Sequence, residues 1–259
     1  IGLVIKTLKS SYDKVGMYDT LRGVMCGYEG AQAITSQWKA TEDIQDHMLY
    51  FLENHDEQRV ASDYFAGNAK CGIPALIVSA LMQKNPFMLY AGEEFGEKGM
   101  DSEGFSGVDG RTTIFDYWCV DTLRRGYFSR KELTKEEKNL EKMHGQILNI
   151  AATERAVTDG EFYDLMYANP VSDSFDAVHL YAFIRKHEDK TLLVIANFSD
   201  TPQAASVCIP RHAIEYLALT EGRHTATELL TGKTQEIMVS ADDPLQTLVP
   251  ALSGVVLSW

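Results

Sequence analysis

The most constraining feature of the sequence is a strand–helix–strand pattern between residues 49 and 90. Two short apolar runs, at residues 49–52 and 86–90, each end in a cluster of polar residues. Between them, apolar side chains recur with helical spacing over residues 73–81, and Pro74 fits the first turn of that helix. This spacing predicts a βαβ unit with parallel strands. Parallel units with acids just beyond their strand ends indicate a barrel whose function lies at the C-terminal ends of its strands.

The length of this region limits what it can build. A closed barrel of eight such units takes roughly 250 residues, so residues 1–155 have room for only three or four. Open strands would leave unpaired edges. We therefore predict an α/β part that is a partial (β/α)8 TIM barrel, roughly its last three strands and helices, with the first half absent.

After Ala156 the pattern changes to β structure. Residues 178–185 alternate in the manner of a strand, residues 192–196 form a buried-strand run, and residues 254–259 form another strand. This spacing is typical of an all-β antiparallel sandwich. We predict two domains, a barrel part at 1–156 and a β-sandwich at 157–259.

Two further segments complete the first part. Residues 95–130 are rich in Gly, Asp and Ser, which predicts a long loop. Aromatic residues within the segment indicate that this loop is ordered and packed. Thr134 and Glu137 then form a capping box ahead of an apolar helix face that extends to Ala151.

Charge and composition exclude several classes of protein. The 259 residues carry 24 Lys and Arg against 37 Asp and Glu, a net charge of −13. This acidity argues against nucleic-acid binding through phosphate neutralisation and against a polybasic membrane surface. No run of 18 apolar residues predicts a membrane span. The charge fits a secreted, periplasmic or cytoplasmic protein equally well, so the localisation stays unknown.

The start of the chain and its cysteines leave alternatives open. Ile1 is preceded by neither Met nor a charged leader, so either a leader was removed or the chain begins inside a longer polypeptide. The cysteines lack metal-ligand spacing, which favours reduced, partly buried thiols over a zinc site, although an even number also permits disulfides. They are Cys26, Cys71, Cys119 and Cys208.

The polar clusters at the strand ends are the candidate site. His55 and Asp56 could together hydrogen-bond the paired hydroxyls of a sugar ring, although a His-Asp pair alone is weak evidence. Glu93 and Glu94 follow the next strand and could flank a glycosidic bond, where retaining chemistry needs carboxylates about 5–5.5 Å apart. A hydrogen-bonded supporting role for these two glutamates is favoured. Aromatic residues that could stack on sugars, but that more often pack in a core, are Trp38, Tyr90, Phe105, Tyr117 and Trp118.

Three segments resemble the alpha-amylase superfamily of glycoside hydrolases. Residues 51–56 resemble the strand-seven motif of that family, residues 86–96 its strand-eight segment, and residues 109–118 the loop that follows. Residues 12–19 are similar to the strand-six region, and the part from about 157 resembles the C-terminal β-sandwich. The segments occur in the family's order and spacing over nearly the whole chain.

The resemblance implies a (β/α)8 barrel that cleaves α-glucosidic bonds with retention. Of the family's three acids, only the third maps here, onto Asp56, which is the implied catalytic residue that binds sugar hydroxyls and favours the distorted ring. His55 maps to the family's substrate-binding histidine. The family's nucleophile lies in an Arg-x-Asp context, and no arginine here is followed by Asp at that spacing. No glutamate lies within residues 1–11 to serve as the general acid.

The leading hypothesis is therefore the C-terminal portion of an alpha-amylase-type hydrolase acting on α-1,4-glucans such as starch and maltooligosaccharides. We expect this portion to be inactive, and to aggregate, without the missing N-terminal half of the barrel. One alternative is a non-catalytic amylase-fold subunit that binds carbohydrate, although an intact His55–Asp56 pair argues against a lost site. Another is a transglycosylase or isomerase on the same scaffold, since transfer and hydrolysis differ in water access.

No cofactor is expected in this chain. There is no Gly-rich phosphate loop. The family often carries structural calcium, but its ligands usually lie in the first half of the barrel. The acidic loop around Asp101, Glu103 and Asp109 lacks the ligand spacing of a calcium site, and we favour solvated charge there.

Overall fold

A parallel sheet organises the first part of the chain. The computed structural model describes residues 11–101, 108–115 and 120–259. Its strands are paired in the order β1–β2–β3, with Ser11 opposite Met48 and Tyr50 opposite Phe87. The predicted parallel pairing is confirmed, although two of the strands are only two residues long. The strands are β1 (Ser11–Tyr12), β2 (Met48–Phe51) and β3 (Phe87–Met88).

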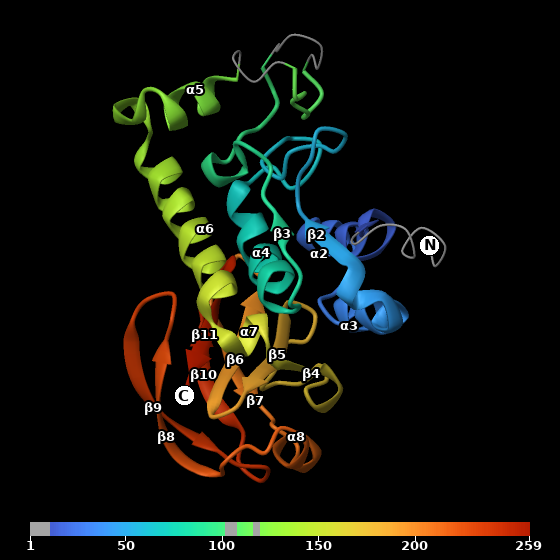
Figure 1. Ribbon diagram of the computed structural model, residues 1–259, viewed down its shortest axis with the longest axis vertical. Coiled ribbons are helices and arrows are strands. Elements are labelled where there is room, and N and C mark those ends of the chain that lie inside the picture. The colour runs from blue at the N-terminus through green and yellow to red at the C-terminus, as the bar shows by residue number, and fades with distance from the viewer. Residues whose placement is uncertain (1–10, 102–107, 116–119) are drawn as a thin grey trace.

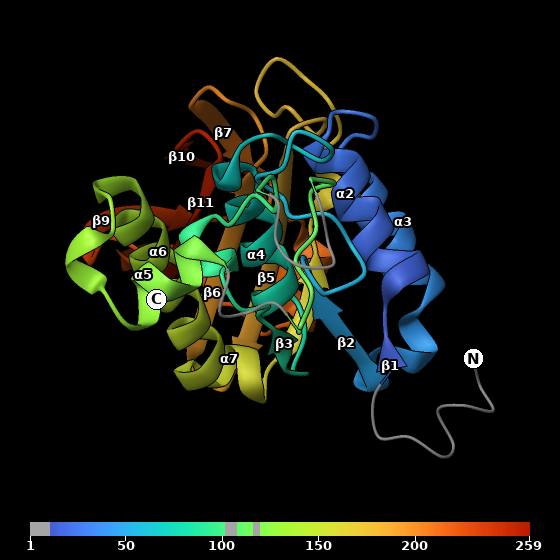
Figure 2. The ribbon, with the colours of Figure 1, turned by 90° about the horizontal axis from the view of Figure 1, so that it is seen from above.

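Helix α4 (Gly72–Leu81) lies at the centre of the molecule, between the parallel strands and the second sheet (Figure 2). All ten of its residues are buried. A helix that is apolar all round must be covered on every side, and α4 contacts β2, α6 and the antiparallel sheet. Pro74 lies in its first turn, as predicted, where the missing N–H costs nothing.

Helix α6 (Lys135–Thr153) begins at the predicted capping box. The Thr134 side chain accepts a hydrogen bond from the backbone N–H of Glu137 at 3.1 Å, and the Glu137 carboxylate accepts one from the Thr134 N–H at 2.7 Å. The helix runs alongside α4 (Figure 1).

The prediction of one long loop over 95–130 was wrong in part, because residues 121–127 form a helix. It is short, and Asp121 pairs with Arg124 and Arg125 at the i+3 and i+4 positions, a signal readable from sequence. Residues 102–107 and 116–119 of this segment lie outside the described residues. The remaining helical segments of the first part are η1 (Lys14–Tyr18), α2 (Asp19–Met25), α3 (Ala33–Ala40), η2 (Glu42–His47), η3 (Ala69–Cys71), η4 (Glu93–Phe95), α5 (Asp121–Tyr127), η5 (Arg130–Glu132) and α7 (Arg155–Thr158).

The rest of the chain is dominated by antiparallel strands, as predicted. Six strands are ordered β4–β5–β6–β11–β8–β9, and β10 pairs separately with β7. The prediction of purely β structure missed one short helix and one 3₁₀ turn. The elements are β4 (Glu161–Asp164), η6 (Met166–Ala168), β5 (Leu180–His187), β6 (Lys190–Asn197), β7 (Gln203–Val207), α8 (Arg211–Tyr216), β8 (Gly222–Glu228), β9 (Lys233–Val239), β10 (Leu245–Val249) and β11 (Ser253–Ser258).

The two parts meet over a continuous hydrophobic core. The first six residues of strand β5 are buried, including those on the side that the alternating sequence suggested was more polar, and α7 packs against this strand. On that side the Arg185 guanidinium donates hydrogen bonds to the carbonyls of Met82, Ala156, Val157 and Gly160. These acceptors lie on both sides of the predicted boundary at 156/157, and that division into domains stays a prediction.

Two further observations bear on the sequence-based expectations. Cys26, Cys71 and Cys208 are free, partly buried thiols, and Cys119 lies outside the described residues. None of the helices in the described ranges has both the length and the hydropathy needed to cross a lipid bilayer.

Candidate functional site

Acidic side chains follow all three parallel strands. Asp13 comes after β1, Glu53 after β2 and Glu93 after β3. Because the C-terminal ends of parallel strands share one edge of the sheet, these residues gather at the same end of the molecule. All three are buried, so they form the floor of this edge rather than its surface.

His55 and Asp56 lie above that floor and are open to solvent. The Asn54 side-chain oxygen accepts hydrogen bonds from the backbone N–H groups of Asp56 at 2.8 Å and Glu57 at 2.9 Å. This turn fixes the backbone directly beneath the pair. His55 Nε2 lies 3.5 Å from Asp56 Oδ2, and the two side chains are 52% and 75% exposed. The pair is thus available to a ligand at the end of β2.

A buried ion pair supports the turn from below. Arg59 donates to Glu53 Oε2 at 2.6 Å, to the Ala91 carbonyl at 2.8 Å and, through Nε, to Thr112 Oγ1 at 3.0 Å. Its guanidinium also lies 4.2 Å from the centre of the Tyr90 ring. One side chain therefore links the segments that follow β2 and β3 to the loop at Thr112, and it holds the loop of the His55–Asp56 pair in one arrangement.

Glu93 continues this network towards helix α6. His144 Nε2 lies 3.8 Å from Glu93 Oε1, and both residues are buried. Burial raises the pKa of Glu93, and the nearby His144 opposes that rise only in part. For His144, burial disfavours the charged form, but Glu93 outweighs burial and the pKa of His144 rises.

Glu53, the partner of Arg59, also has a raised carboxyl pKa. Burial raises the pKa of Glu53 to about 7, and the nearby Glu93 carboxyl adds to the rise while Arg59 opposes it. The floor of the site can therefore change its proton content near neutral pH.

Glu94 also has a supporting position. Its carboxylate accepts hydrogen bonds from the Gly92 N–H at 2.9 Å and from the Tyr127 hydroxyl at 2.6 Å. Glu93 and Glu94 are both buried and held by neighbouring residues. The geometry agrees with the favoured supporting role and not with a pair of carboxylates that flank a substrate bond.

Sequence reasoning did not single out Asp13. It is buried, one of its carboxylate oxygens lacks a hydrogen bond, and burial raises its pKa. Its other oxygen lies where a Cβ on Gly16 would come within 2.0 Å, so only glycine fits at that position. An Asp at a strand end followed by Gly three residues later was the available signal.

The aromatic candidates divide between two places. Tyr90 lies at the strand ends, where its ring contacts Arg59 and its hydroxyl donates to the Thr112 carbonyl at 2.9 Å. Trp38 lies elsewhere, with its ring 4.8 Å from that of Phe162 of the antiparallel sheet, in keeping with the packing role expected for most of these aromatic residues. Phe105, Tyr117 and Trp118 lie outside the described residues.

No metal-binding group is found among the described residues. Within these ranges, no three or more His, Cys, Asp or Glu side chains converge on a point that could hold an ion. In the acidic loop, Asp101 is exposed, Asp109 pairs with Arg111 at 3.3 Å, and Glu103 lies outside the described residues. The residues present do not fit a calcium site, and no step of the chemistry is assigned to a metal here.

The chain joins parallel strands that end in buried acids to an antiparallel sheet, and solved alpha-amylase structures have a similar fold. No protein-family model matches the sequence, and no curated protein does. The likeness is to solved structures with 12–18% identity, so it is a likeness of fold.

Three of these structures show its extent. A noncanonic maltogenic alpha-amylase, AmyB from Thermotoga neapolitana, has a TM-score of 0.69 and 13% identity over 99% of this chain and 52% of its own. AmyP in complex with maltose has a TM-score of 0.69 and 17% identity over 97% and 50%. The alpha-amylase from H. orenii has a TM-score of 0.63 and 16% identity over 97% and 49%. This chain spans about half the length of these structures.

Proposed function

We propose that this chain is the C-terminal portion of a retaining alpha-amylase-type glycoside hydrolase that acts on α-1,4-glucans. In this proposal, β1, β2 and β3 are the last three strands of a (β/α)8 barrel, and residues 157–259 form the C-terminal β-sandwich domain. The observation that carries it is the solvent-exposed His55–Asp56 pair at the end of β2, fixed by Asn54 and supported by the Glu53–Arg59 ion pair. The half-length likeness to amylase structures agrees with this reading.

Asp56 and His55 are proposed to act on one sugar ring. The Asp56 carboxylate accepts hydrogen bonds from adjacent ring hydroxyls, and these bonds strengthen as the ring flattens towards the oxocarbenium-like transition state. His55 hydrogen-bonds the same sugar and holds it in register. The nucleophile and the general acid are supplied by the N-terminal half of the barrel, which is the partner this portion requires. Any structural calcium is likewise assigned to that half.

The test uses the natural polypeptide that contains these 259 residues, assayed for maltooligosaccharide hydrolysis with the products identified. Asp56→Asn should lower kcat at least about 100-fold, because it removes a charge that acts chiefly in the transition state. Asp173→Asn changes an exposed aspartate on the antiparallel part and is the matched control. Unchanged kcat in Asp56→Asn would show that the proposed role of Asp56 is wrong.

The products and the isolated portion give two further readouts. Longer oligosaccharides or cyclic products in place of short ones would indicate transfer instead of hydrolysis. The 259 residues alone should show no turnover and should aggregate. Turnover above a host-protein blank would overturn the assignment of the nucleophile and acid to the other half.

A further inference from the structure

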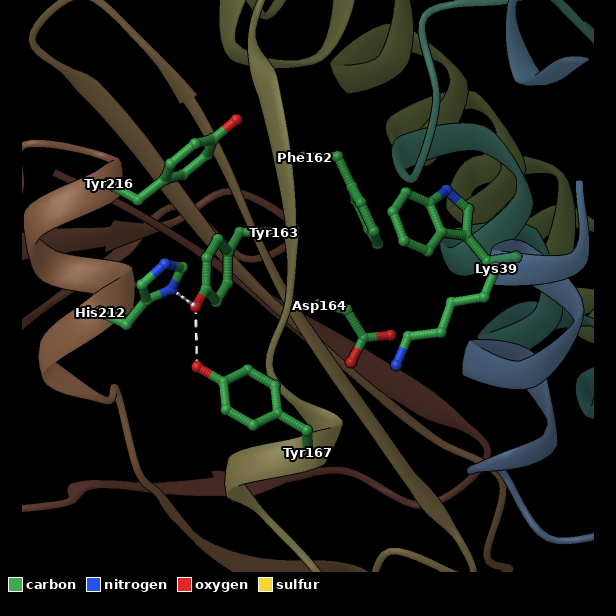
Figure 3. A pocket seen from close by; sticks show the side chains of 8 residues that line it. Lys39, Phe162, Tyr163, Asp164, Tyr167, His212 and Tyr216 are labelled. Atoms are coloured by element: carbon green, nitrogen blue, oxygen red, sulfur yellow. Dashed lines mark hydrogen bonds between the residues drawn. The ribbon is translucent and has the colours of Figure 1, made fainter. Parts of the chain in front are cut away.

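A groove lined by aromatic side chains lies far from the strand-end site. It has a volume of about 250 Å³ and is bounded by α3, β4, η6 and α8 (Figure 3). Its lining residues are Trp38, Lys39, Phe162, Tyr163, Asp164, Tyr167, His212 and Tyr216. Aromatic rings that border a hollow offer flat apolar surface for contact with a ligand.

The rings on one side of β4 form an ordered cluster. The Tyr163 hydroxyl hydrogen-bonds both the Tyr167 hydroxyl and His212 Nδ1, each at 2.7 Å. His212 and Tyr216, one helical turn apart on α8, have nearly parallel ring planes at 12° with centroids 6.1 Å apart. Tyr167 and Tyr216 remain 57% and 60% exposed. The hydrogen bonds fix the rings of Tyr163, Tyr167 and His212, and the Tyr216 ring stacks on His212 while most of its surface stays open.

The polar groups at the rim of the groove differ in whether they hydrogen-bond the rest of the chain. The Asp164 carboxylate already accepts hydrogen bonds from the Thr35 hydroxyl, the Tyr181 hydroxyl and the Met166 N–H. Lys39 and the Tyr216 hydroxyl make no hydrogen bond with any part of the chain that the structure describes. The groove thus has exposed ring faces, and the Lys39 ammonium and Tyr216 hydroxyl beside them can hydrogen-bond a ligand.

A second hollow adjoins the first across the Tyr216 ring. It has a similar volume, about 250 Å³, and Tyr216 lines both. Its rim carries side chains of both signs, among them Glu161, Lys186 and Glu188. Two hollows that share one aromatic ring suit a linear ligand of several rings, and the mixed charges suit a neutral one.

The groove and the strand-end site lie at opposite ends of the parallel strands. Trp38 and Lys39 are near the end of α3, from which η2 leads into the start of β2, whereas Asp56 follows the end of β2. Figure 1 shows α8 at the lower end of the molecule and α5, near the strand ends, at the top. The groove is therefore not an extension of the strand-end site.

We propose that this groove is a second carbohydrate-binding site that holds a stretch of α-glucan. The apolar face of one glucose unit stacks on Tyr216, and its hydroxyl edges hydrogen-bond Lys39, the free His212 nitrogen and the groups of the second hollow. A sugar is a neutral polyol with flat apolar faces. Its faces can stack on the exposed rings, and its hydroxyls can hydrogen-bond the polar groups beside them. The choice of glucan rests on the proposed function, whereas the groove itself does not.

The test measures maltoheptaose binding by calorimetry to the natural polypeptide that contains this chain. Each variant is made with Asp56→Asn as well, so that bound sugar is not hydrolysed. Tyr216→Ala should weaken the groove's affinity about tenfold or more, and Tyr167→Ala should weaken it less. Tyr216→Phe keeps the stacking ring and should retain most of the binding. Tyr28→Ala and Tyr64→Ala remove exposed tyrosines outside the groove and should change nothing.

The outcomes separate this proposal from the proposed function. If Asp56→Asn abolishes hydrolysis but no binding depends on Tyr216, the groove proposal fails alone. If binding depends on Tyr216 but Asp56→Asn leaves hydrolysis intact, only the role of Asp56 fails. Self-association that Tyr216→Ala abolishes, or a peptide strand paired with the edge strand β4 in a crystal of the natural polypeptide, would overturn the sugar assignment.

Discussion

Two regions of this molecule each bury an arginine, and they satisfy it in different ways. Arg59 and Arg185 are both 1% exposed. At the strand ends, Arg59 pairs with the Glu53 carboxylate, and the neighbouring Glu93 carboxyl faces the His144 imidazole. These two carboxyl groups and the imidazole can gain or lose a proton. At the junction with the antiparallel sheet, Arg185 is held by four backbone carbonyls, and no carboxylate in the described part of the chain forms an ion pair with it.

The two regions therefore differ in how their charges respond to pH. Burial lowers the pKa of Arg185 to about 10, which leaves it charged at neutral pH, and carbonyls do not titrate. The strand-end network contains carboxyl and imidazole groups whose pKa values lie closer to neutrality. We infer that the junction holds the two parts together under all ordinary conditions, whereas the strand-end floor changes with pH.

The largest expected effect is the loss of the Glu53 carboxylate. Above pH 7, where the Glu53 carboxyl is ionised, Glu53→Leu leaves the Arg59 guanidinium charged, buried and without its counterion, which should lower the free energy of unfolding by about 3–5 kcal/mol. Urea unfolding of the natural polypeptide measures this. Glu42→Leu, at an exposed position, is the control. A loss below about 1 kcal/mol would mean that Arg59 is already satisfied by Thr112 and Ala91.

Arg185→Met tests the junction and should cost about 2–4 kcal/mol. The methionine fills the space, but the carbonyls of Met82, Ala156, Val157 and Gly160 lose their donor. Arg185→Lys should recover part of the loss, because an ammonium has only three donors for four acceptors. Equal stability of the Met and Lys variants would show that hydrogen bonding at the junction contributes nothing.

The pH dependence of stability should distinguish the two regions. Glu53 keeps its proton to about pH 7 in the folded state but loses it near pH 4.5 when unfolded, so folding becomes less favourable as the pH rises between those values. His144, whose pKa is raised, contributes stability that is lost as the pH rises through that value. The contribution of this network to the free energy of unfolding should therefore fall from pH 4.5 to above pH 7.

The matched comparison uses Glu53→Gln and Arg185→Lys, each measured by urea unfolding at a series of pH values. Glu53→Gln should flatten the decline, and Arg185→Lys should leave its slope unchanged. A slope that changes with Arg185 instead would reverse the assignment of the responsive region.

The smallest effect concerns helix α6, which links the two regions. Thr134→Ala removes the N-terminal cap and should cost about 1 kcal/mol. His144 lies on this helix, whereas three of the four Arg185 acceptors, in Ala156, Val157 and Gly160, follow its C-terminal end. Hydrogen exchange should therefore accelerate in the first turn of α6 and not in α7. Uniform acceleration along both helices would show that the two regions do not open separately.

The sequence predicted the parts of the fold that depend on local patterns. The parallel pairing of β2 and β3, the buried helix α4 and the capping box at Thr134 all follow from hydrophobic spacing and turn chemistry. The short helices α5 and α8 were missed because six or seven residues carry too little periodicity to stand out. Arg185 could not have been predicted as buried, because its partners are carbonyls distant in sequence.

The site divides in the same way. His55, Asp56 and the supporting glutamates follow strand ends, so their placement can be predicted once the strands are. The groove around Tyr216 brings together side chains from α3, β4 and α8, and no motif links those segments. Trp38 was noticed as an aromatic candidate, but only the tertiary fold shows which surface it joins.

The strand order of the antiparallel sheet has a consequence for synthesis. Strand β11 is the last of the six to leave the ribosome, yet it lies in the middle of the sheet, between β6 and β8. A Cβ on Gly254 would meet the Ile195 carbonyl oxygen at 2.6 Å and the Ile77 side chain at 2.8 Å, so this strand must fit closely against both β6 and α4. Until residues 253–258 emerge, the nascent chain holds two separate groups of paired strands, β4–β5–β6 and β8–β9, with an open slot between them. A chaperone that shields this slot would be needed until β11 has paired with β6 and β8.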